Sequence, residues 1–281
     1  MAEEFTKSDL EILISTMNRN SLDFLIPMFP SRKFFEFNIL IVNQTTENQL
    51  LNSEFPTVRI INSFEKGLSK SRNLALKNAR GKLLLIADDD VSYLSNFDEN
   101  IASVFNQNNQ ASIICFQTKT FQNRPYSNYA KDKFLMNFKH VFWVLSIEIA
   151  VNKQDLIRKK IEFNENFGLG AQFQDSESLF FLRRTIYNGL NVLFFPEYIT
   201  VHHEKSSSDD VESDRWLYAK GASLYKRYQM ASYLWLLKVI LFLWRKNIIK
   251  SKEIGAKFKV GLKGIKDYKS LLKGNLEYLY K

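Results

Sequence analysis

The hydrophobic residues of the first part of the chain fall in short unbroken runs, and most of these runs end in polar residues. An apolar run of this kind is typical of a strand that is buried on both faces of a parallel sheet. Residues 67–79 instead carry apolar side chains at helical spacing, with Ser69 or Ser71 as candidate caps and Gly81 as the stop. The predicted strands are residues 11–16, 37–42, 57–61 and 83–87.

The alternation of strands and helices continues through the middle of the chain. Residues 111–116 and 141–151 are predicted strands, and a helix is predicted from Asp175 to about Tyr187. Two further short strands, 191–195 and 198–202, are predicted on either side of Pro196. Strands that alternate with helices in this way predict a doubly wound α/β fold.

Three consecutive aspartates, Asp88, Asp89 and Asp90, follow directly after the run at 83–87. In a parallel sheet, ligands bind at the carboxyl ends of the strands, so these carboxylates are expected at the site. Adjacent like charges repel unless a cation or a ligand neutralises them. Hard oxygen ligands suit Mg²⁺ or Mn²⁺, usually shared with the phosphates of a substrate. The alternative is a solvated acidic turn.

Other polar residues stand where chemistry is possible. Glu148 lies among apolar neighbours and faces either water or a site. Asp175 and Glu177 open a helix, where a carboxylate either complements the helix dipole or serves as a general base. His202 ends a predicted strand, and it is either an ordinary surface or core histidine or a metal ligand.

Several classes of protein are excluded by what the sequence lacks. It contains neither GxGxxG nor GxxxxGK[ST], so no dinucleotide fingerprint and no P-loop is present. The one cysteine, Cys115, excludes a disulfide framework and is expected in the core of a protein from a reducing compartment. The polar start, MAEEFTKSDL, has no apolar core, so no secretory signal is expected there.

The last part of the chain is strongly basic. The whole chain has a net charge of +9, yet residues 215–281 alone hold sixteen Lys and Arg against three Asp and Glu. Residues 230–244 form an apolar stretch interrupted by Lys238, which is short for a membrane span. Tryptophans and flanking basic residues are typical of an interfacial helix at an anionic membrane, and the bulky apolar face favours lipid over nucleic acid. The alternatives are packing on the catalytic domain, self-association and a true span.

The residues of the first two thirds of the chain resemble the family-two glycosyltransferases. The resemblance rests on the run GLSKSRNLALKNARGKLLLIADDDV, on the opening strand that ends in Thr-Met-Asn-Arg, and on the downstream FNENFGLGA segment. The SIEIAV, FGLGA and P-x-x-I-x-x-H elements are most similar to bacterial members that build capsular and other surface polysaccharides.

This resemblance implies a GT-A fold that binds a nucleotide-diphosphate sugar, expected to be a UDP-sugar, and transfers the sugar with inversion. It implies that Mn²⁺ or Mg²⁺ is held on the diphosphate by a DxD-type motif, here Asp88 and Asp90, completed by His202. The residues implied to contact the nucleotide sugar are Thr16, Asn18, Arg19, Asn43, Gln44, Lys66, Arg72, Asp88 and Asp89.

Two positions depart from the family pattern. The second strand usually ends in acidic residues, but here it ends in Asn43-Gln44, whose amides can still hydrogen-bond a base edge. The family base is usually the Asp of a Glu-Asp pair, which is absent here. Asp175 is the first choice for the base and Glu177 the second, depending on how the segment is aligned.

The resemblance therefore implies a metal-dependent inverting glycosyltransferase that uses a saccharide or lipid-linked acceptor in surface polysaccharide synthesis. The rival interpretations are a catalytically inactive scaffold subunit and a sugar nucleotidyltransferase. The expected domains are a GT-A domain at 1–210, divided into a nucleotide-sugar half at 1–92 and an acceptor half at 93–210, and a basic helical region at 211–281. The expected location is cytoplasmic, peripheral at the inner face of the cell membrane.

Overall fold

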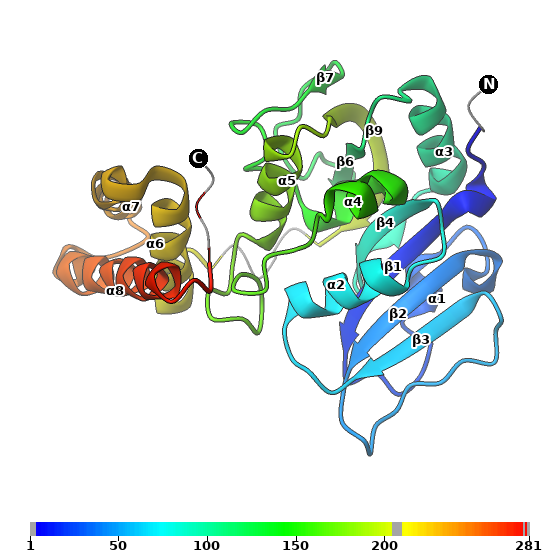
Figure 1. Cartoon of the computed structure of the whole chain (residues 1–281), viewed down its shortest axis with the longest axis horizontal. Helices are drawn as coiled ribbons and strands as arrows, with labels where there is room; N and C mark the ends of the chain where they lie inside the picture. Colours follow the sequence, from blue (N-terminus) through cyan, green and yellow to red (C-terminus); the bar gives the residue numbers. More distant parts are fainter. Residues whose placement is uncertain (1–3, 204–209, 278, 280–281) are drawn as a thin grey trace. The chain divides into compact units, whose positions relative to one another are not determined.

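The computed structural model describes residues 4–203, 210–277 and 279. The chain divides into two compact units, Met1–Asn164 with Ser178–Glu204, and Glu165–Glu177 with Lys205–Lys281 (Figure 1). This division differs from the boundary expected at residue 210, because residues 165–177 group with the C-terminal helices instead of with the acceptor half.

The first unit is built on one sheet. Among the described residues the sheet has nine strands, of which eight follow the order β3–β2–β1–β4–β8–β6–β9–β5, and the ninth, β7, pairs with β9. The half from β3 to β4 is parallel, whereas β8 runs antiparallel to both β4 and β6. The strands are β1 Leu10–Met17, β2 Asn38–Gln44, β3 Val58–Ser63, β4 Leu83–Asp88, β5 Ser92–Tyr93, β6 Ile113–Thr120, β7 Phe134–Leu135, β8 Ile149–Asn152 and β9 Val192–His202.

Helices cover both faces of this sheet. Alternate residues of a strand point to opposite faces, so Ile12 and Ile14 join one apolar cluster and Leu13 joins the other. The first cluster includes residues of α1 (Leu25–Met28) and α3 (Phe97–Gln107). The second includes residues of α2 (Leu68–Asn78), α4 (Lys153–Lys159) and α5 (Glu177–Tyr187). Short 3-10 turns complete the unit: η1 Lys7–Asp9, η2 Phe34–Glu36 and η3 Ser146–Glu148.

The prediction of a strand at 141–151 is wrong for most of these residues. Only Ile149–Asn152 is extended, and it follows the turn η3. The Glu148 carboxylate accepts the N–H of Leu145 (3.0 Å), which closes the turn just before the strand begins. A side-chain acceptor for the backbone favours a turn over a ladder, and the apolar pattern alone carried no sign of that bond.

Two smaller expectations are also corrected. Pro196 does not end a strand: β9 runs through it, because the β6–β9 register shifts between Cys115 and Gln117 and the ladder passes from Phe194 to Tyr198. Neither serine caps α2, whose N-cap is Gly67 with φ 131°. Ser71 instead lies inside the helix, where its hydroxyl contacts that of Ser15 at 3.0 Å.

The second unit consists of helices and the 165–177 segment. Its helices are α6 Asp214–Tyr228, α7 Ser232–Arg245 and α8 Ile254–Lys273, with 3-10 turns η5 Gln229–Ala231 and η6 Ser251–Glu253. Glycines let α6 and α8 approach closely, since a Cβ added at Gly264 would lie 2.0 Å from the Tyr218 carbonyl oxygen. No helix in the described ranges is both long enough and apolar enough to cross a membrane.

Candidate active site

The carboxyl ends of β1, β2 and β4 lie side by side in the first unit. The strand register pairs Ser15 with Asp88 and Thr16 with Asn43. Because these strands are parallel, the polar residues that follow them meet at one edge of the sheet. The structure thus brings together most of the residues that the sequence assigned to the nucleotide sugar.

Asp89 is bound by residues from the end of β1. The Thr16 hydroxyl donates to its Oδ2 at 2.5 Å, and Arg19 donates to the same oxygen from Nη2 (2.6 Å) and Nε (2.9 Å). Arg19 can reach this carboxylate because the chain turns sharply at Asn18, which has a left-handed φ of 55°. Asp89 is therefore paired with a cationic side chain, that of Arg19.

Asp88 is bound from the other side. Arg72 of α2 donates from Nη2 to its Oδ1 at 2.8 Å, and the Arg72 side chain is only 1% exposed. The Ser146 hydroxyl of η3 donates to Oδ2 at 3.3 Å. A buried guanidinium beside a half-buried carboxylate is a charged pair joined by a hydrogen bond.

Asp90 contacts the last residue of β9. Its Oδ1 lies 3.3 Å from Nε2 of His202, and the Asp90 side chain is 55% exposed. The hydrogen bond from His202 is the largest cause that lowers the pKa of Asp90. Burial opposes protonation of the imidazole, but the bond to Asp90 and its negative charge outweigh burial and raise the pKa of His202.

His202 is oriented for cation binding. Its Nδ1 lies 2.9 Å from the carbonyl oxygen of His203. A carbonyl oxygen only accepts, so Nδ1 carries a hydrogen. Nε2 then donates to Asp90 in the protonated ring, and it has a lone pair for a cation in the neutral ring. A metal-binding histidine is usually oriented by such a bond through its other nitrogen, so Asp90 and the neutral His202 ring can offer one oxygen and one nitrogen to a cation.

The predicted three-residue metal set is only partly assembled. No group of three His, Cys, Asp or Glu side chains that could hold a metal ion is found in the part of the chain that the structure describes. Asp90 and His202 lie together, whereas Asp88 contacts Arg72 and Ser146. Two protein donors fit an Mg²⁺ or Mn²⁺ ion that takes its other ligands from substrate phosphates and water.

The two amides at the end of β2 make internal bonds. Asn43 is fully buried, accepts the Arg19 N–H and donates to the Arg19 carbonyl. Gln44 accepts the N–H of Gly67 at 2.6 Å. Any contribution of Asn43 to nucleotide binding would therefore act through Arg19. Lys66, next to Gly67 in the loop before α2, is exposed.

The two candidate bases belong to the second unit. Asp175 is half-buried, and its Oδ2 accepts the Ser176 hydroxyl at 2.9 Å. Ser176 has a left-handed φ of 68°, and its Oγ also lies 3.2 Å from the Ser223 hydroxyl of α6, which can donate to it. Glu177 is the first residue of α5 and is half-buried. The contacts hold Asp175 against α6 and do not by themselves choose between the two carboxylates.

Two features of the site were missed in the sequence. Ser146 contacts Asp88, although only Glu148 in the SIEIAV segment was singled out from the sequence as a candidate site residue. The ring of Tyr126 lies 5.9 Å from that of His202. Neither residue sits at a recognisable spacing from the aspartates, because both reach the site through the long segment between β6 and β8.

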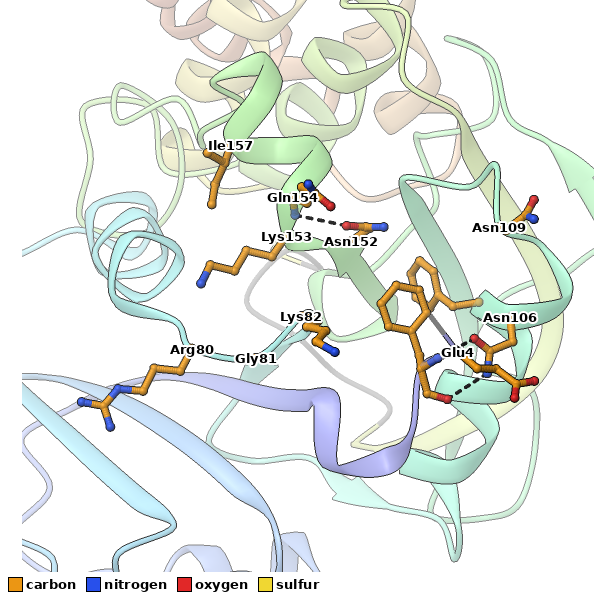
Figure 2. Close-up of a pocket in the computed structure, with 12 residues that line it drawn as sticks. Glu4, Arg80, Gly81, Lys82, Asn106, Asn109, Asn152, Lys153, Gln154 and Ile157 are labelled. Atoms are coloured by element: carbon orange, nitrogen blue, oxygen red, sulfur yellow. Dashed lines mark hydrogen bonds between the residues drawn. The ribbon is translucent and has the colours of Figure 1, made fainter. Parts of the chain in front are cut away.

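A cavity of about 920 Å³ lies elsewhere in the first unit. It is at the opposite edge of the sheet, beside Gly81 and Lys82 before β4 and Asn152 at the end of β8 (Figure 2). Its lysines already have protein partners, since Lys82 pairs with Asp9 (3.1 Å) and Lys153 donates to the Ala79 carbonyl (2.7 Å). None of the predicted site residues lines this cavity.

Comparisons with known proteins agree with this arrangement. The family model of glycosyl transferase family 2 matches residues 35–162. An uncharacterised glycosyltransferase of Haemophilus influenzae is 25% identical over 114 residues, which is 39% of this chain and 39% of that protein.

Solved structures of S. aureus TarS are similar in fold. The 1–349 fragment with UDP-GlcNAc has a TM-score of 0.58 at 14% identity, covering 92% of this chain and 80% of the fragment. A longer TarS chain has a TM-score of 0.54 at 16% identity, covering 87% of this chain but only 46% of TarS. The likeness confirms the predicted GT-A fold with its C-terminal helical region.

Proposed function

Because residues 35–162 match the family model of glycosyl transferase family 2, we propose that this chain is a metal-dependent inverting transferase of sugars from nucleotide-diphosphate donors. We take UDP-sugars as the first donors to test, since the structurally similar TarS fragment was solved with UDP-GlcNAc. The observation that carries the proposal is the set of three aspartates after β4, which contact Arg72, Arg19 and His202 in turn.

The donor side of the reaction follows from these contacts. Arg19 and Arg72 hold carboxylates in the free protein, and their planar donors suit a diphosphate equally well. A bound Mn²⁺ or Mg²⁺ would neutralise the charge that develops on the departing nucleoside diphosphate. Asp90 and His202 are the residues that would hold it, and Ser146 and Arg72 keep Asp88 oriented beside them.

The acceptor side needs a base because a sugar hydroxyl is a poor nucleophile at neutral pH. We assign this proton transfer to Asp175 first and to Glu177 second. The hydroxyl attacks the anomeric carbon from the face opposite the diphosphate, so the configuration inverts and no covalent enzyme intermediate forms. Ser176 and Ser223 position Asp175 for this step.

We further propose a saccharide or lipid-linked acceptor used in bacterial surface polysaccharide synthesis, and peripheral attachment at the inner face of the cell membrane through the second unit. Support comes from the basic charge of the tail and from the uncovered apolar side chains of α7. Self-association through the same helices is the alternative.

The test of the enzymatic proposal is the variant Asp90→Asn. UDP release from a panel of UDP-sugars with Mn²⁺ should fall by at least about 100-fold, the scale of losing a metal or electrostatic contact in a transfer site. The folded structure should survive, because Asp90 is largely exposed. The exposed Glu99→Gln on α3 is the matched control. Near-normal turnover in Asp90→Asn would remove the metal-site assignment.

The choice of base is tested separately. Asp175→Asn and Glu177→Gln should each still give a thermal shift with UDP and Mn²⁺, since neither residue contacts the diphosphate in the proposed mechanism. The variant that lacks the true base should lose about 10²–10⁴-fold in transfer rate. If both variants transfer sugar normally, the acceptor side of the proposal is wrong.

A further inference from the structure

Helix α7 carries two apolar faces, and only one of them is covered. Leu236, Ile240 and Leu243 are buried in the apolar cluster of the second unit, together with residues of α6 and α8. Their spacing of four and three residues is that of one helical stripe. A helix that only supported this cluster would need no other apolar stripe.

The opposite side of α7 is also apolar but exposed. Leu234, Leu237 and Leu241 repeat at helical spacing, and Leu234 is 66% exposed. Phe242 is 56% exposed, and further exposed apolar side chains on or beside the helix are Met230, Trp235, Trp244 and Ile248. We call this set, with the basic residues described next, the outer face of α7. Exposed apolar side chains that gather along one helix mark a binding surface.

The outer face is basic as well as apolar. Lys238, Arg245 and Lys246 border a hollow of about 460 Å³ together with Leu241 and Phe242. The sequence from Ser232 to Arg245 contains no Asp or Glu. The Lys238 ammonium lies 4.6 Å from the centre of the Trp235 ring, so its stem lies along the apolar surface. Apolar walls with three cations at the rim fit an anionic headgroup and the start of its acyl chains.

The length of α7 decides how it meets a bilayer. Fourteen residues rise about 21 Å, less than the roughly 30 Å hydrocarbon core. Such a helix lies in the interface plane, where tryptophans and basic side chains reach the headgroups.

A second copy of this chain is the poorer occupant. In a two-fold interface the same surface meets itself. The outer face would then place Lys238, Arg245 and Lys246 opposite equal charges, without any carboxylate on α7 to pair with them. Anionic lipid supplies the missing negative charge.

We propose that the outer face of α7 docks on an anionic phospholipid bilayer, with lipid phosphates held at Lys238 and Arg245. Only the consequence of docking for the acceptor rests on the proposed function. The second unit that docks also holds the segment with Asp175, because Arg215 donates to the Gln174 carbonyl (3.0 Å) and Phe173 packs on Tyr218. Docking therefore brings the candidate base to the membrane, where a lipid-linked acceptor is anchored.

The test is co-sedimentation of the full chain with vesicles. We expect binding to vesicles of phosphatidylcholine with 30% phosphatidylglycerol, and little binding to pure phosphatidylcholine, in ~0.15 M salt. Lys238→Gln and Arg245→Gln should each lower the partition coefficient about fivefold. Leu237→Ser with Leu241→Ser should abolish binding, whereas Ile157→Ser, which replaces a still more exposed apolar residue on α4, should leave it unchanged.

Three outcomes would overturn the proposal. They are a wild-type chain that stays in the supernatant, equal binding by the leucine double variant, and a wild-type dimer that the double variant dissociates. Circular dichroism confirms that each variant is folded. Asp90→Asn should bind vesicles as wild type does, so failure of the catalytic proposal and failure of the docking proposal give different results.

Discussion

Glu148 offers the sharpest physical test of the first unit. Its side chain is completely buried between η3 and β8. The Tyr129 hydroxyl donates to Oε1, and the Leu145 N–H donates to Oε2. Burial raises the pKa of Glu148 to about 7, against these hydrogen bonds, which favour the ionised form.

The magnitude follows from linkage. A rise in pKa from the ordinary 4.5 to about 7 corresponds to about 3 kcal/mol against the ionised carboxyl in the folded state. Below pH 4.5 Glu148 is protonated in both the folded and the unfolded chain. The folded state then carries no penalty from this carboxyl, so its stability has its full value. As the pH rises through the folded pKa near 7, the stability is lost, because the unfolded chain ionises at lower pH.

The variant Glu148→Gln removes this titration. The amide resembles the protonated acid, since its oxygen can accept from Leu145 and its NH₂ can donate to Tyr129. Relative to wild type, the free energy of unfolding of the variant should rise by about 2.5 kcal/mol between pH 5 and pH 8. Two titratable side chains, Tyr129 and Cys115, also interact with Glu148. Burial is the main cause that raises the pKa of each, so both stay neutral between pH 5 and pH 8.

The assay is urea unfolding at pH 5 and pH 8, followed by hydrogen exchange in peptides from β6 and β8. This readout reports on the first unit and not on the helical one. The exposed Glu54→Gln is the control and should follow wild type at both pH values. If the stabilities of Glu148→Gln and wild type change in parallel with pH, the buried carboxyl does not titrate as argued.

Two further predictions concern the second unit. Gly264→Ala should destabilise it by about 1–3 kcal/mol, because the new Cβ would lie 2.0 Å from the Tyr218 carbonyl oxygen. Gly255→Ala on the same helix is the control: its new Cβ meets no atom within 4 Å, so the variant should be neutral or stabilising. If the two variants have equal thermal midpoints by circular dichroism, the close packing at Gly264 is refuted. Lys226→Met should destabilise by about 3 kcal/mol, because it leaves the buried Glu277 carboxylate without the ammonium that lies 2.9 Å away. Adding Glu277→Leu should restore most of that loss in the same assay, and a double variant no more stable than the single one would contradict the pairing.

Local pattern was enough to find the elements that build the site. The run at 83–87 was predicted as a buried strand, and β4 is Leu83–Asp88. The helix predicted at 67–79 is α2, Leu68–Asn78. A strand that is buried on both faces needs an unbroken apolar run, and a helix that is buried on one face needs apolar residues three and four positions apart. Both patterns can therefore be recognised in the sequence alone.

Local pattern failed where a hydrogen bond, a strand pairing or a packing contact that apolar spacing does not encode decided the structure. The turn at Ser146–Glu148 replaced a predicted strand because the Glu148 carboxylate closes it. Pro196 was read as a strand break, yet a shifted register on β6 lets β9 continue. Residues 165–177 were assigned to the acceptor half, yet their aromatic side chains pack with Tyr218 and Tyr268 in the second unit.

The sequence by itself therefore determined that three carboxylates end a central parallel strand, because polar residues after an apolar run must leave the core at the strand's carboxyl end. It did not determine what each carboxylate faces. Only the tertiary structure decided that Asp88 contacts Arg72, that Asp89 contacts Arg19 and that Asp90 contacts His202. These partners come from α2, from the end of β1 and from the end of β9, and their proximity depends on strand register and helix packing, which have no signature in the spacing of residues along the chain.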